Sequence, residues 1–292
     1  MKNITNRGFS ILCDFMDINR FMLEIYEKDW RNGVPAPFLE YALVSDWMDK
    51  SMVHRFRIWE DGDKIVGFVF YENPINHVFF SLRPGYEELA GEMVAYAKGS
   101  MPRVDGRLKL MIFDRQEAVR KAAKTAGFEK TYEYMDKIIG FDKPLDYSLP
   151  EGFHFVKPEE LSAAKVSECC WKGFNHEETE GPWDGDYEYM NYMKMAPHLH
   201  PEDAVLIESD TGEYACYAGM WWTPENKLAY MEPLCTIPKY RRMGLAAAAL
   251  SEHYRRLKPK GATHMTGGSD PFYDKIGYQP MVLWTFWEHQ AE

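Results

Sequence analysis

The sequence predicts an α+β protein built from two domains of similar plan. Its 292 residues are more than one compact core usually holds, and 46% hydrophobic with 15% aromatic residues is typical of globular chains. Turn glycines recur 150 positions apart, at Gly62 and Gly212 and again at Gly127 and Gly277. Between the halves, residues 142–152 are rich in proline and glycine and have the composition of a linker.

The first half alternates helices and strands. Two short runs alternate apolar and polar residues on either side of the turn at residues 60–63, which predicts a hairpin. Gly127 suits the C-terminus of a helix. In order, the expected elements are helices at residues 18–28 and 38–49, strands at 55–59, 65–71 and 77–82, a helix at 86–98, a strand at 108–113, a helix at 116–126 and a strand at 132–139.

The second half repeats this plan after the linker. Its expected elements are helices near residues 159–172 and 187–195, strands at 204–208, 214–222 and 228–237, and a helix after Gly244. We therefore expect a first domain at residues 1–143 and a second domain at residues 151–292.

The most informative stretch is residues 227–250, which reads KLAYMEPLCTIPKYRRMGLAAAAL. Its first part, 228–237, is apolar, aromatic and β-branched between turn residues, which predicts a strand. The alanine run that follows predicts a helix able to lie close against a sheet. The turn between them, with Arg241, Arg242 and Gly244, would point unpaired N–H groups and the positive end of a helix dipole at one spot. This arrangement predicts an anion site, and the arginines favour phosphate.

The same residues resemble a known family. Arg241-x-x-Gly244-x-Ala246 is similar to the (Gln/Arg)-x-x-Gly-x-(Gly/Ala) signature of the GNAT acyltransferases, and residues 269–278 resemble a late tyrosine-containing segment of that family. The resemblance covers the second half well and the first half in outline. It implies a tandem of two GNAT-like domains, each a mixed, mostly antiparallel twisted sheet flanked by helices.

In GNAT proteins this region binds acetyl-coenzyme A (acetyl-CoA), the acyl donor. The resemblance implies that the pantetheine arm pairs like an added strand with the main chain of Leu234, Cys235, Thr236 and Ile237. Pro233 lacks an N–H group and would interrupt strand pairing just before this segment. The pyrophosphate is then expected in the loop formed by Arg241, Arg242, Met243, Gly244, Leu245 and Ala246.

The resemblance also implies two catalytic residues. Tyr273 corresponds to the family tyrosine that protonates the leaving thiolate, and the alternative is a tyrosine packed in the core. Glu232 corresponds to a carboxylate that often acts as general base, and a charged residue in an apolar strand is costly without a partner or a task. The alternative is a salt-bridged glutamate, with Asp270 and His264 as reserve bases. Ser269 or Asp270 stands where the family often has an asparagine, and both are candidate cofactor contacts.

Substrate selection is expected in the helices that open the second half. Aromatic residues are interleaved there with carboxylates, which suits an amine with an apolar body. The alternative is a surface loop with an aromatic anchor. The candidate substrate-binding residues are Trp171, Phe174, His176 and Trp183.

The first half lacks the phosphate-binding side chains. When the halves are aligned, Tyr86 matches Tyr240, but the two residues after Tyr86 are Glu87 and Glu88 instead of two arginines. Carboxylates would repel a pyrophosphate, so we expect the first domain to keep the fold without the cofactor site. The alternative is that two unrelated α/β domains align by coincidence.

Composition excludes several function classes. The net charge of −11 argues against nucleic acid and anionic membranes as partners, and it favours cationic amines. Five cysteines without a C-x-x-C pair argue against a disulfide framework or a zinc site, so no metal is expected. No apolar run is long enough to span a membrane, and we expect a cytoplasmic protein. The sequence indicates no oligomeric state.

Together these observations predict an acetyl-CoA-dependent N-acetyltransferase that acts on a primary amine of a small molecule. Transfer of another acyl group is one alternative. A non-catalytic module that binds CoA or a partner protein is the other.

Overall fold

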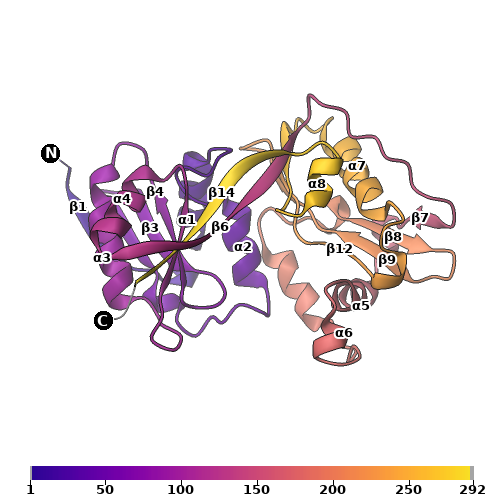
Figure 1. Cartoon of the computed structure of the whole chain (residues 1–292), viewed down its shortest axis with the longest axis horizontal. Helices are drawn as coiled ribbons and strands as arrows, with labels where there is room; N and C mark the ends of the chain where they lie inside the picture. Colours follow the sequence, from indigo (N-terminus) through magenta and orange to yellow (C-terminus); the bar gives the residue numbers. More distant parts are fainter. Residues whose placement is uncertain (1, 290–292) are drawn as a thin grey trace. The chain divides into compact units, whose positions relative to one another are not determined.

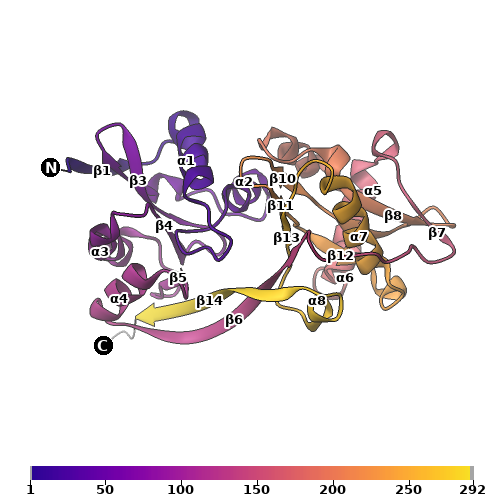
Figure 2. The ribbon, with the colours of Figure 1, turned by 90° about the horizontal axis from the view of Figure 1, so that it is seen from above.

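The computed structural model describes residues 2–289, which form two compact units of strands flanked by helices (Figures 1 and 2). The first unit contains the described residues up to Asp136 and the strand segment from Pro280, and the second unit is Lys137–Gln279. The predicted α+β class is confirmed. The expected domain ranges, 1–143 and 151–292, differ from these units mainly at the C-terminus, because the last strand lies in the first unit.

The first unit has a mixed sheet in the strand order β1-β2-β3-β4-β5-β14-β6. Its strands are β1 (Ile4–Gly8), β2 (Arg57–Asp61), β3 (Lys64–Tyr71), β4 (His77–Leu82), β5 (Lys109–Phe113), β14 (Gln279–His289) and the first part of β6 (Phe128–Gly140). Its helices are α1 (Ile11–Ile25), α2 (Ala36–Val44), α3 (Ala90–Ser100) and α4 (Glu117–Thr125). Both α1 and α3 pack on β3, which explains why this strand is apolar at nearly every position.

The second unit contains two sheet segments. One has the order β6-β13-β11-β10, and the other has the order β12-β9-β8-β7. The strands are β7 (Phe153–Phe155), β8 (Val205–Ser209), β9 (Tyr214–Ala218), β10 (Trp221–Thr223), β11 (Leu228–Tyr230), β12 (Leu234–Thr236) and β13 (His264–Thr266), with the end of β6. The helices are α5 (Ala163–Gly173), α6 (His176–Thr179), α7 (Leu245–Leu257) and α8 (Pro271–Lys275).

The expected single strand at residues 228–237 is instead two strands in two sheet segments. Strand β11 pairs with β10 and β13, whereas β12 pairs with β9. Pro233 has no N–H to donate, and its carbonyl accepts a hydrogen bond from Gly219 N at 2.8 Å, which draws the chain towards β9. The neighbouring strand expected at 214–222 is interrupted at Gly219 in the same way.

Helices α5 and α7 cover opposite faces of the segment β12-β9-β8-β7. On one face, Val166 and Cys169 of α5 pack with alternate strand residues. On the other face, Leu245, Ala248 and Ala249 of α7 pack with the remaining ones. The alanines allow the close approach of α7 that their sequence predicts.

Several expected helices have other bounds in the structure. Those expected at 18–28 and 38–49 are α1 and α2, which begin earlier and end three and five residues earlier. Two helices expected in the second unit differ as well. The one expected at 159–172 begins later, where the Ser162 hydroxyl accepts a hydrogen bond from Lys165 N at 3.4 Å. The one expected at 187–195 is a run of 3₁₀ turns, Glu188–Met195. Strand β1 was not expected, because its sequence is polar and mostly exposed and so shows no apolar alternation. Among the described helices, none combines the length and apolar composition that crossing a bilayer requires.

Candidate active site

The candidate site is built around a fork between two parallel strands. Strands β11 and β13 pair side by side, with Ala229 opposite Met265. Beyond this pair, Met231 N donates a hydrogen bond to the Thr266 side-chain oxygen at 2.8 Å. The strands then separate, because the chain after Met231 enters the other sheet segment as β12. Met231 and Thr266 therefore form the vertex of the fork.

Strand β12 has one free edge. Among the strands that the structure describes, β12 pairs only with β9. Gly219 N and Ile237 N make ladder hydrogen bonds of 2.8 Å and 3.0 Å with Pro233 O and Ala215 O. In this strand, the main-chain N–H and C=O groups of odd-numbered residues thus point towards β9. Those of Leu234 and Thr236 point away from it. Within residues 2–289, the N–H groups of Leu234 and Thr236 and the carbonyl of Leu234 have no hydrogen-bond partner.

The loop after β12 presents a row of main-chain donors. Arg242 and Gly244 both adopt left-handed backbone conformations, with φ of 66° and 89°. Gly244 is the N-cap of α7, and an added Cβ there would meet nothing within 4 Å, so the backbone angle is what requires glycine. In the described part of the chain, the N–H groups of residues 242–247 donate no hydrogen bond. Six free donors at the start of a 13-residue helix form a site that favours an anion.

The two arginines of this loop have different surroundings. Arg241 Nε donates to Thr236 O at 3.0 Å, and its Nη2 donates to Gly173 O at 2.8 Å and to the Asn175 side chain at 2.7 Å. Its main-chain N–H donates to Pro238 O at 3.2 Å. Arg241 therefore ties the end of α5 to the end of β12.

Arg242 is exposed, and in the part of the chain that the structure describes it makes no hydrogen bond or ion pair. The nearby ammonium groups of Lys172 and Lys239 both pair with the carboxylate of Glu213. A hydrogen bond to Glu213 raises the pKa of Lys239, which keeps this lysine charged. Arg242 is thus the loop cation that is free to bind a ligand.

Helix α5 approaches β12 very closely. A Cβ added to Gly173 would lie 2.7 Å from both Cβ and Sγ of Cys235, so only glycine fits there. The Cys235 side chain is buried against α5 and donates a weak hydrogen bond to Cys169 O at 3.7 Å. Cys235 therefore has a packing role, and only its main chain is placed to contact a ligand at the strand edge.

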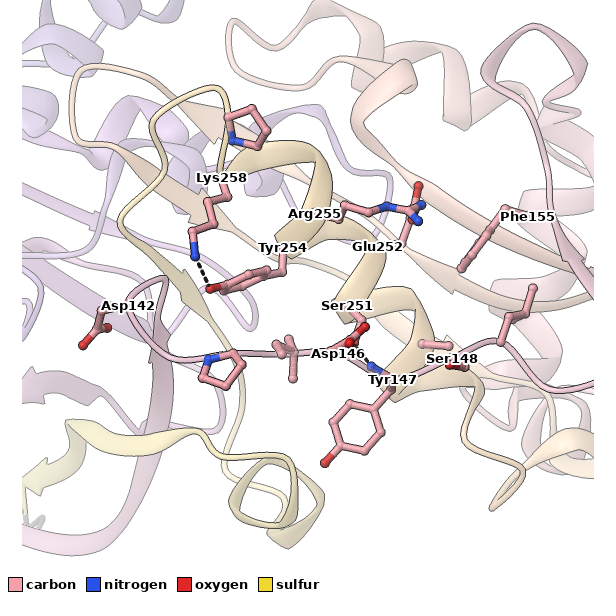
Figure 3. A pocket seen from close by; sticks show the side chains of 15 residues that line it. Asp142, Asp146, Tyr147, Ser148, Phe155, Ser251, Glu252, Tyr254, Arg255 and Lys258 are labelled. Atoms are coloured by element: carbon pink, nitrogen blue, oxygen red, sulfur yellow. Dashed lines mark hydrogen bonds and ion pairs between the residues drawn. The ribbon is translucent and has the colours of Figure 1, made fainter.

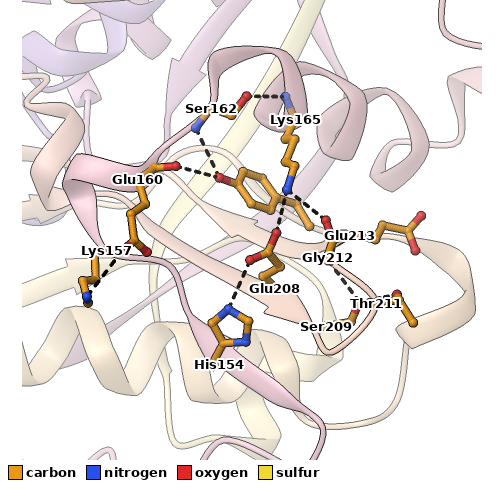
Figure 4. Close-up of polar contacts among 11 residues, drawn as sticks. His154, Lys157, Glu160, Ser162, Lys165, Glu208, Ser209, Thr211, Gly212 and Glu213 are labelled. Atoms are coloured by element: carbon orange, nitrogen blue, oxygen red, sulfur yellow. Dashed lines mark hydrogen bonds and ion pairs between the residues drawn. The ribbon is translucent and has the colours of Figure 1, made fainter.

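The other end of α5 is fixed to the hairpin between β8 and β9 (Figure 4). Lys165 Nζ donates to Glu208 at 2.7 Å and to Gly212 O at 2.9 Å. His154 lies 3.1 Å from the other oxygen of the same carboxylate. The hydrogen bond from Lys165 lowers the pKa of Glu208 despite its partial burial, so the carboxylate stays ionised and holds the helix.

Glu232 directly follows the vertex residue Met231 on one arm of the fork. Its carbonyl accepts a hydrogen bond from Trp221 Nε1 at 3.0 Å, and an added Cβ on Gly219 would lie 2.3 Å from that oxygen. Trp221 is fully buried, which fixes the main chain of Glu232. The Glu232 side chain itself is half-buried.

Tyr273 lies on the other arm. Its ring packs on Gly267, the residue after the vertex residue Thr266, and a Cβ there would lie 2.7 Å from the rings of both Tyr273 and Tyr278. The centroids of the two rings are 5.1 Å apart, and Tyr273 is buried, with 8% of its surface exposed. Glu232 and Tyr273 thus lie on opposite arms, each next to the vertex.

Helix α8 holds Tyr273 in place. The Asp270 carboxylate accepts a hydrogen bond from Phe272 N at 2.7 Å and caps the helix. Lys137, which is buried, donates to Ser269 O at 2.7 Å and pairs with Asp274 at 3.1 Å. Ser269 and Asp270 therefore support the helix, and their role as cofactor contacts stays a prediction. The reserve base His264 is fully buried in β13, and Thr263 lies 2.9 Å from its Nδ1.

The predicted substrate residues lie in the last turn of α5 and in the segment that follows it. Trp171 stacks on His176 with ring centroids 5.0 Å apart, and its indole donates to Gly181 O at 2.9 Å. His176 lies 2.6 Å from Glu180, and Phe174 is 46% exposed. Trp183 donates to a main-chain carbonyl three residues later at 3.1 Å. Arg241 binds Gly173 and Asn175, which lie between Trp171 and His176 in the chain. Contact of the four predicted residues with a substrate stays a prediction.

The first unit has a fork at the corresponding place, and its own side chains fill it. Strands β4 and β5 pair in parallel only up to Phe79 and Met111. Beyond this pair, the buried Gln116 side chain donates to Phe80 O at 2.8 Å and accepts from Phe113 N at 3.1 Å. The Gln116 amide therefore connects β4 and β5 by hydrogen bonds, whereas no such side chain connects the arms of the fork in the described part of the second unit.

A separate cavity of about 720 Å³ lies between α7 and the segment at residues 142–149 (Figure 3). Tyr254 and Lys258 line it and share a hydrogen bond of 2.8 Å, and Tyr147 N donates to the Ser251 hydroxyl at 2.9 Å. None of the predicted site residues lines this cavity, so we leave it outside the candidate site.

Several residues that build the site escaped sequence reasoning. Gly173, Gly267, Thr266 and Lys137 act by close packing or by hydrogen bonds to distant parts of the chain. A glycine at the end of a predicted helix was the one available signal, and it is equally typical of an ordinary helix end.

Comparisons with known proteins agree with this geometry. Residues 167–278 match the model of the acetyltransferase (GNAT) family, which supports acyl transfer from CoA as the general activity of this region. No curated protein matches the sequence.

Solved structures share the fold over nearly the whole chain. A tandem GNAT protein from the clavulanic acid biosynthesis pathway has a TM-score of 0.60 and 14% identity, covering 99% of this chain and 99% of its own. A GCN5-related N-acetyltransferase from Sphaerobacter thermophilus has a TM-score of 0.59 and 13% identity, covering 98% and 95%. A GNAT-family acetyltransferase from Colwellia psychrerythraea has a TM-score of 0.60 and 11% identity, covering 98% and 100%. Residues 167–278 therefore form a domain of the GNAT acetyltransferase family, and the chain as a whole has the tandem GNAT fold.

Proposed function

We propose that the second unit is an acetyl-CoA-dependent N-acetyltransferase that acts on a primary amine of a small molecule. The observation that carries the proposal is the run of unused main-chain groups from the edge of β12 to the loop at residues 242–247. The strand edge suits the amides of a pantetheine arm, and the loop suits a diphosphate. Acetyl-CoA carries these two parts in the same order.

The roles of the two arms follow from their positions. Acetyl-CoA would supply the thioester. Glu232 would accept a proton from the ammonium form of the substrate, so that the neutral amine can attack the carbonyl carbon. The nitrogen would release its second proton to solvent as the tetrahedral state collapses. Tyr273 would protonate the sulfur as the C–S bond breaks. Amine and sulfur are both bonded to the carbonyl carbon in the tetrahedral state, which suits an acid and a base placed on opposite arms.

We further propose that the first unit binds no CoA. Gln116 occupies the space between β4 and β5, and Glu87 and Glu88 replace the arginines of the phosphate loop. Transfer of a different acyl group from CoA, and a non-catalytic CoA-binding role, are the alternatives. A cytoplasmic location stays a prediction of the composition.

Charge reversal in the loop tests the proposal. Arg242→Glu should weaken acetyl-CoA binding at least about 100-fold in calorimetry, because it replaces a charge-assisted hydrogen bond with repulsion. Lys121→Glu is the matched control, since Lys121 is exposed on α4 in the first unit and the net charge changes equally. Equal affinity in both variants would contradict the phosphate site.

Release of CoA with a panel of primary amines then separates an enzyme from a binding module. An enzyme should release free CoA only when a suitable amine is present. Tight acetyl-CoA binding with no release above the hydrolytic background for any amine would favour the non-catalytic alternative.

A further inference from the structure

A small cavity lies in the second unit between residues of α5, the segment at residues 190–204 and the end of β9. Its volume is about 100 Å³, and Leu199 and Met220 are among the residues that line it. Leu199 forms an isolated antiparallel β-bridge with Trp221, whose indole N–H donates a hydrogen bond to the Glu232 carbonyl. Met220 follows Gly219, which packs directly against the same carbonyl. Two lining residues therefore neighbour Trp221 and Gly219, the residues that contact the Glu232 carbonyl.

The walls of this cavity are mainly apolar and adaptable. Met190 and Met193 from the 3₁₀ segment line it together with Met220, Tyr217 and Ala204. Methionine side chains are flexible and polarisable, so they can adjust around an aliphatic group. Its exposed polar lining, Lys194 and His200, belongs to the outer segment at residues 188–203.

The volume limits what the cavity can hold. An apolar protein cavity of about 150 Å³ holds a benzene-sized molecule. A cavity of about 100 Å³ therefore suits a smaller group, such as a chain of about four carbons.

The lining separates this cavity from the proposed donor site. No residue of β12, β13 or the loop at 241–246 belongs to it. The acyl group of a donor held in the fork would lie between those elements. The cavity is therefore not the place where the acyl group of such a donor would lie.

The chain next to the cavity attracts cations. The segment between Phe174 and Tyr189 contains six carboxylates and no lysine or arginine. It leads directly into Met190, which lines the cavity. A local negative potential of this kind raises the concentration of ammonium ions near this segment.

We propose that this cavity holds the aliphatic end of the acceptor, so that the substrate class is primary amines with a compact aliphatic chain of about four carbons. The proposal rests on the N-acetyltransferase function of the second unit. The amine nitrogen lies at Glu232, and the chain extends between Met190, Met193 and Met220.

Methionine methyl NMR tests both proposals with separate signals and without turnover. In protein labelled at the methionine methyl groups, with single Met→Leu variants for assignment, n-butylamine should shift the signals of Met190, Met193 and Met220. Acetyl-CoA should shift Met243, which is 45% exposed in the phosphate loop.

The outcomes separate cleanly. A shift of Met243 with acetyl-CoA, but none of the three cavity signals with n-butylamine, would overturn the acceptor cavity and leave the proposed function standing. Cavity shifts with butyryl-CoA and not with n-butylamine would overturn it too, because the cavity would then hold the acyl chain. No response of Met243 to either CoA ester would count against the donor site instead.

Chain-length kinetics give a second readout. From ethylamine to n-butylamine, kcat/KM should rise about threefold to fourfold per methylene and then fall for hexylamine. Met193→Ala should move the optimum to longer amines, and Met16→Ala, at an exposed position of α1, should leave it in place.

Filling the cavity is the complementary change. Ala204→Leu should remove the chain-length preference and retain the affinity for acetyl-CoA. If Ala204→Leu fails to fold, Met193→Ala tests the same proposal. A preference that survives in Met193→Ala unchanged would refute the proposal.

Discussion

The histidine on the inner face of α7 makes the stability of the second unit sensitive to acid. His253 has no exposed surface, and Ala218 O lies 3.1 Å from its Nε2. Burial lowers the pKa of His253 to about 3, and the positive charge of Arg256 adds to this effect, whereas the hydrogen bond to Ala218 opposes it. The folded protein therefore holds this imidazole neutral throughout the physiological range.

The magnitude follows from proton linkage. The pKa of a histidine in the unfolded chain is about 6.5. Below this pH, His253 binds a proton in the unfolded chain but stays neutral in the folded chain, so the free energy of unfolding decreases as the pH falls. The slope approaches about 1.4 kcal/mol per pH unit. Between pH 7 and pH 5 His253 alone should cost about 2 kcal/mol. This value depends little on the folded pKa, because the folded imidazole is neutral at pH 5 for any pKa below about 4.

His253→Gln isolates this contribution, because glutamine does not titrate and its amide can still donate to the Ala218 carbonyl. Hydrogen exchange of peptides from α7, corrected for intrinsic rates, reports the opening free energy of the second unit at both pH values. The difference between wild type and His253→Gln should change by about 2 kcal/mol from pH 7 to pH 5. His200→Gln, at an exposed position, should follow the wild type. If wild type and His253→Gln lose the same free energy, the neutral buried imidazole is refuted.

Three further changes test other parts of the structure. Tyr273→Phe should lower turnover in the CoA-release assay at least about 100-fold with acetyl-CoA affinity unchanged by calorimetry, and equal losses in both would exclude an acid role. Gln116→Ala should destabilise the first unit by about 2 to 4 kcal/mol in urea unfolding, since two buried main-chain groups lose their partners, without weakening acetyl-CoA binding. Gly173→Ala should cost about 1 to 3 kcal/mol and weaken acetyl-CoA binding, because its Cβ would lie 2.7 Å from Cys235. Gly91→Ala, in α3 with nothing within 4 Å of the added Cβ, should instead be neutral or stabilising, and similar losses in both variants would contradict the close packing of α5.

The elements that the sequence predicts well are those whose pattern depends on a local signal. Strand β4 and the buried run of β3 have the apolar and aromatic composition of strands with covered faces, and α7 has an alanine run between a glycine and a basic end. Strand β1 escaped because an exposed edge strand needs no apolar side chains. Pro233 signalled an interruption of strand pairing. That the chain changes sheet segments there depends on Gly219, fourteen residues earlier in the chain, and no local pattern encodes that partner.

The same limit explains the candidate site. Arg241 and Arg242 are adjacent and look equivalent in sequence, but a left-handed backbone at Arg242 separates their directions. Arg241 becomes part of the framework because the end of α5 offers it carbonyl groups. The anion site can thus be predicted as a loop, whereas the division of labour within it depends on tertiary contacts.

The two units differ in how they satisfy the main-chain groups where their parallel strands separate. In both units a parallel strand pair separates after a few residues, which leaves main-chain groups on the inner edges without ladder partners. Buried groups of this kind are costly unless something pairs with them. The first unit pairs them internally, through the side chain of Gln116 and through Asn32 O, which accepts from Leu82 N at 2.8 Å.

The second unit has no such side chain between β12 and β13 in its described residues. The N–H groups of Leu234 and Thr236 and the carbonyl of Leu234 stay unpaired there at an accessible edge. Where this fold leaves strand edges unpaired, their N–H and C=O groups must form hydrogen bonds either with other groups of the protein or with a ligand. The second unit follows the second course, which agrees with the proposed donor site, and the amide of Gln116 follows the first, which supports the proposal that the first unit binds no CoA.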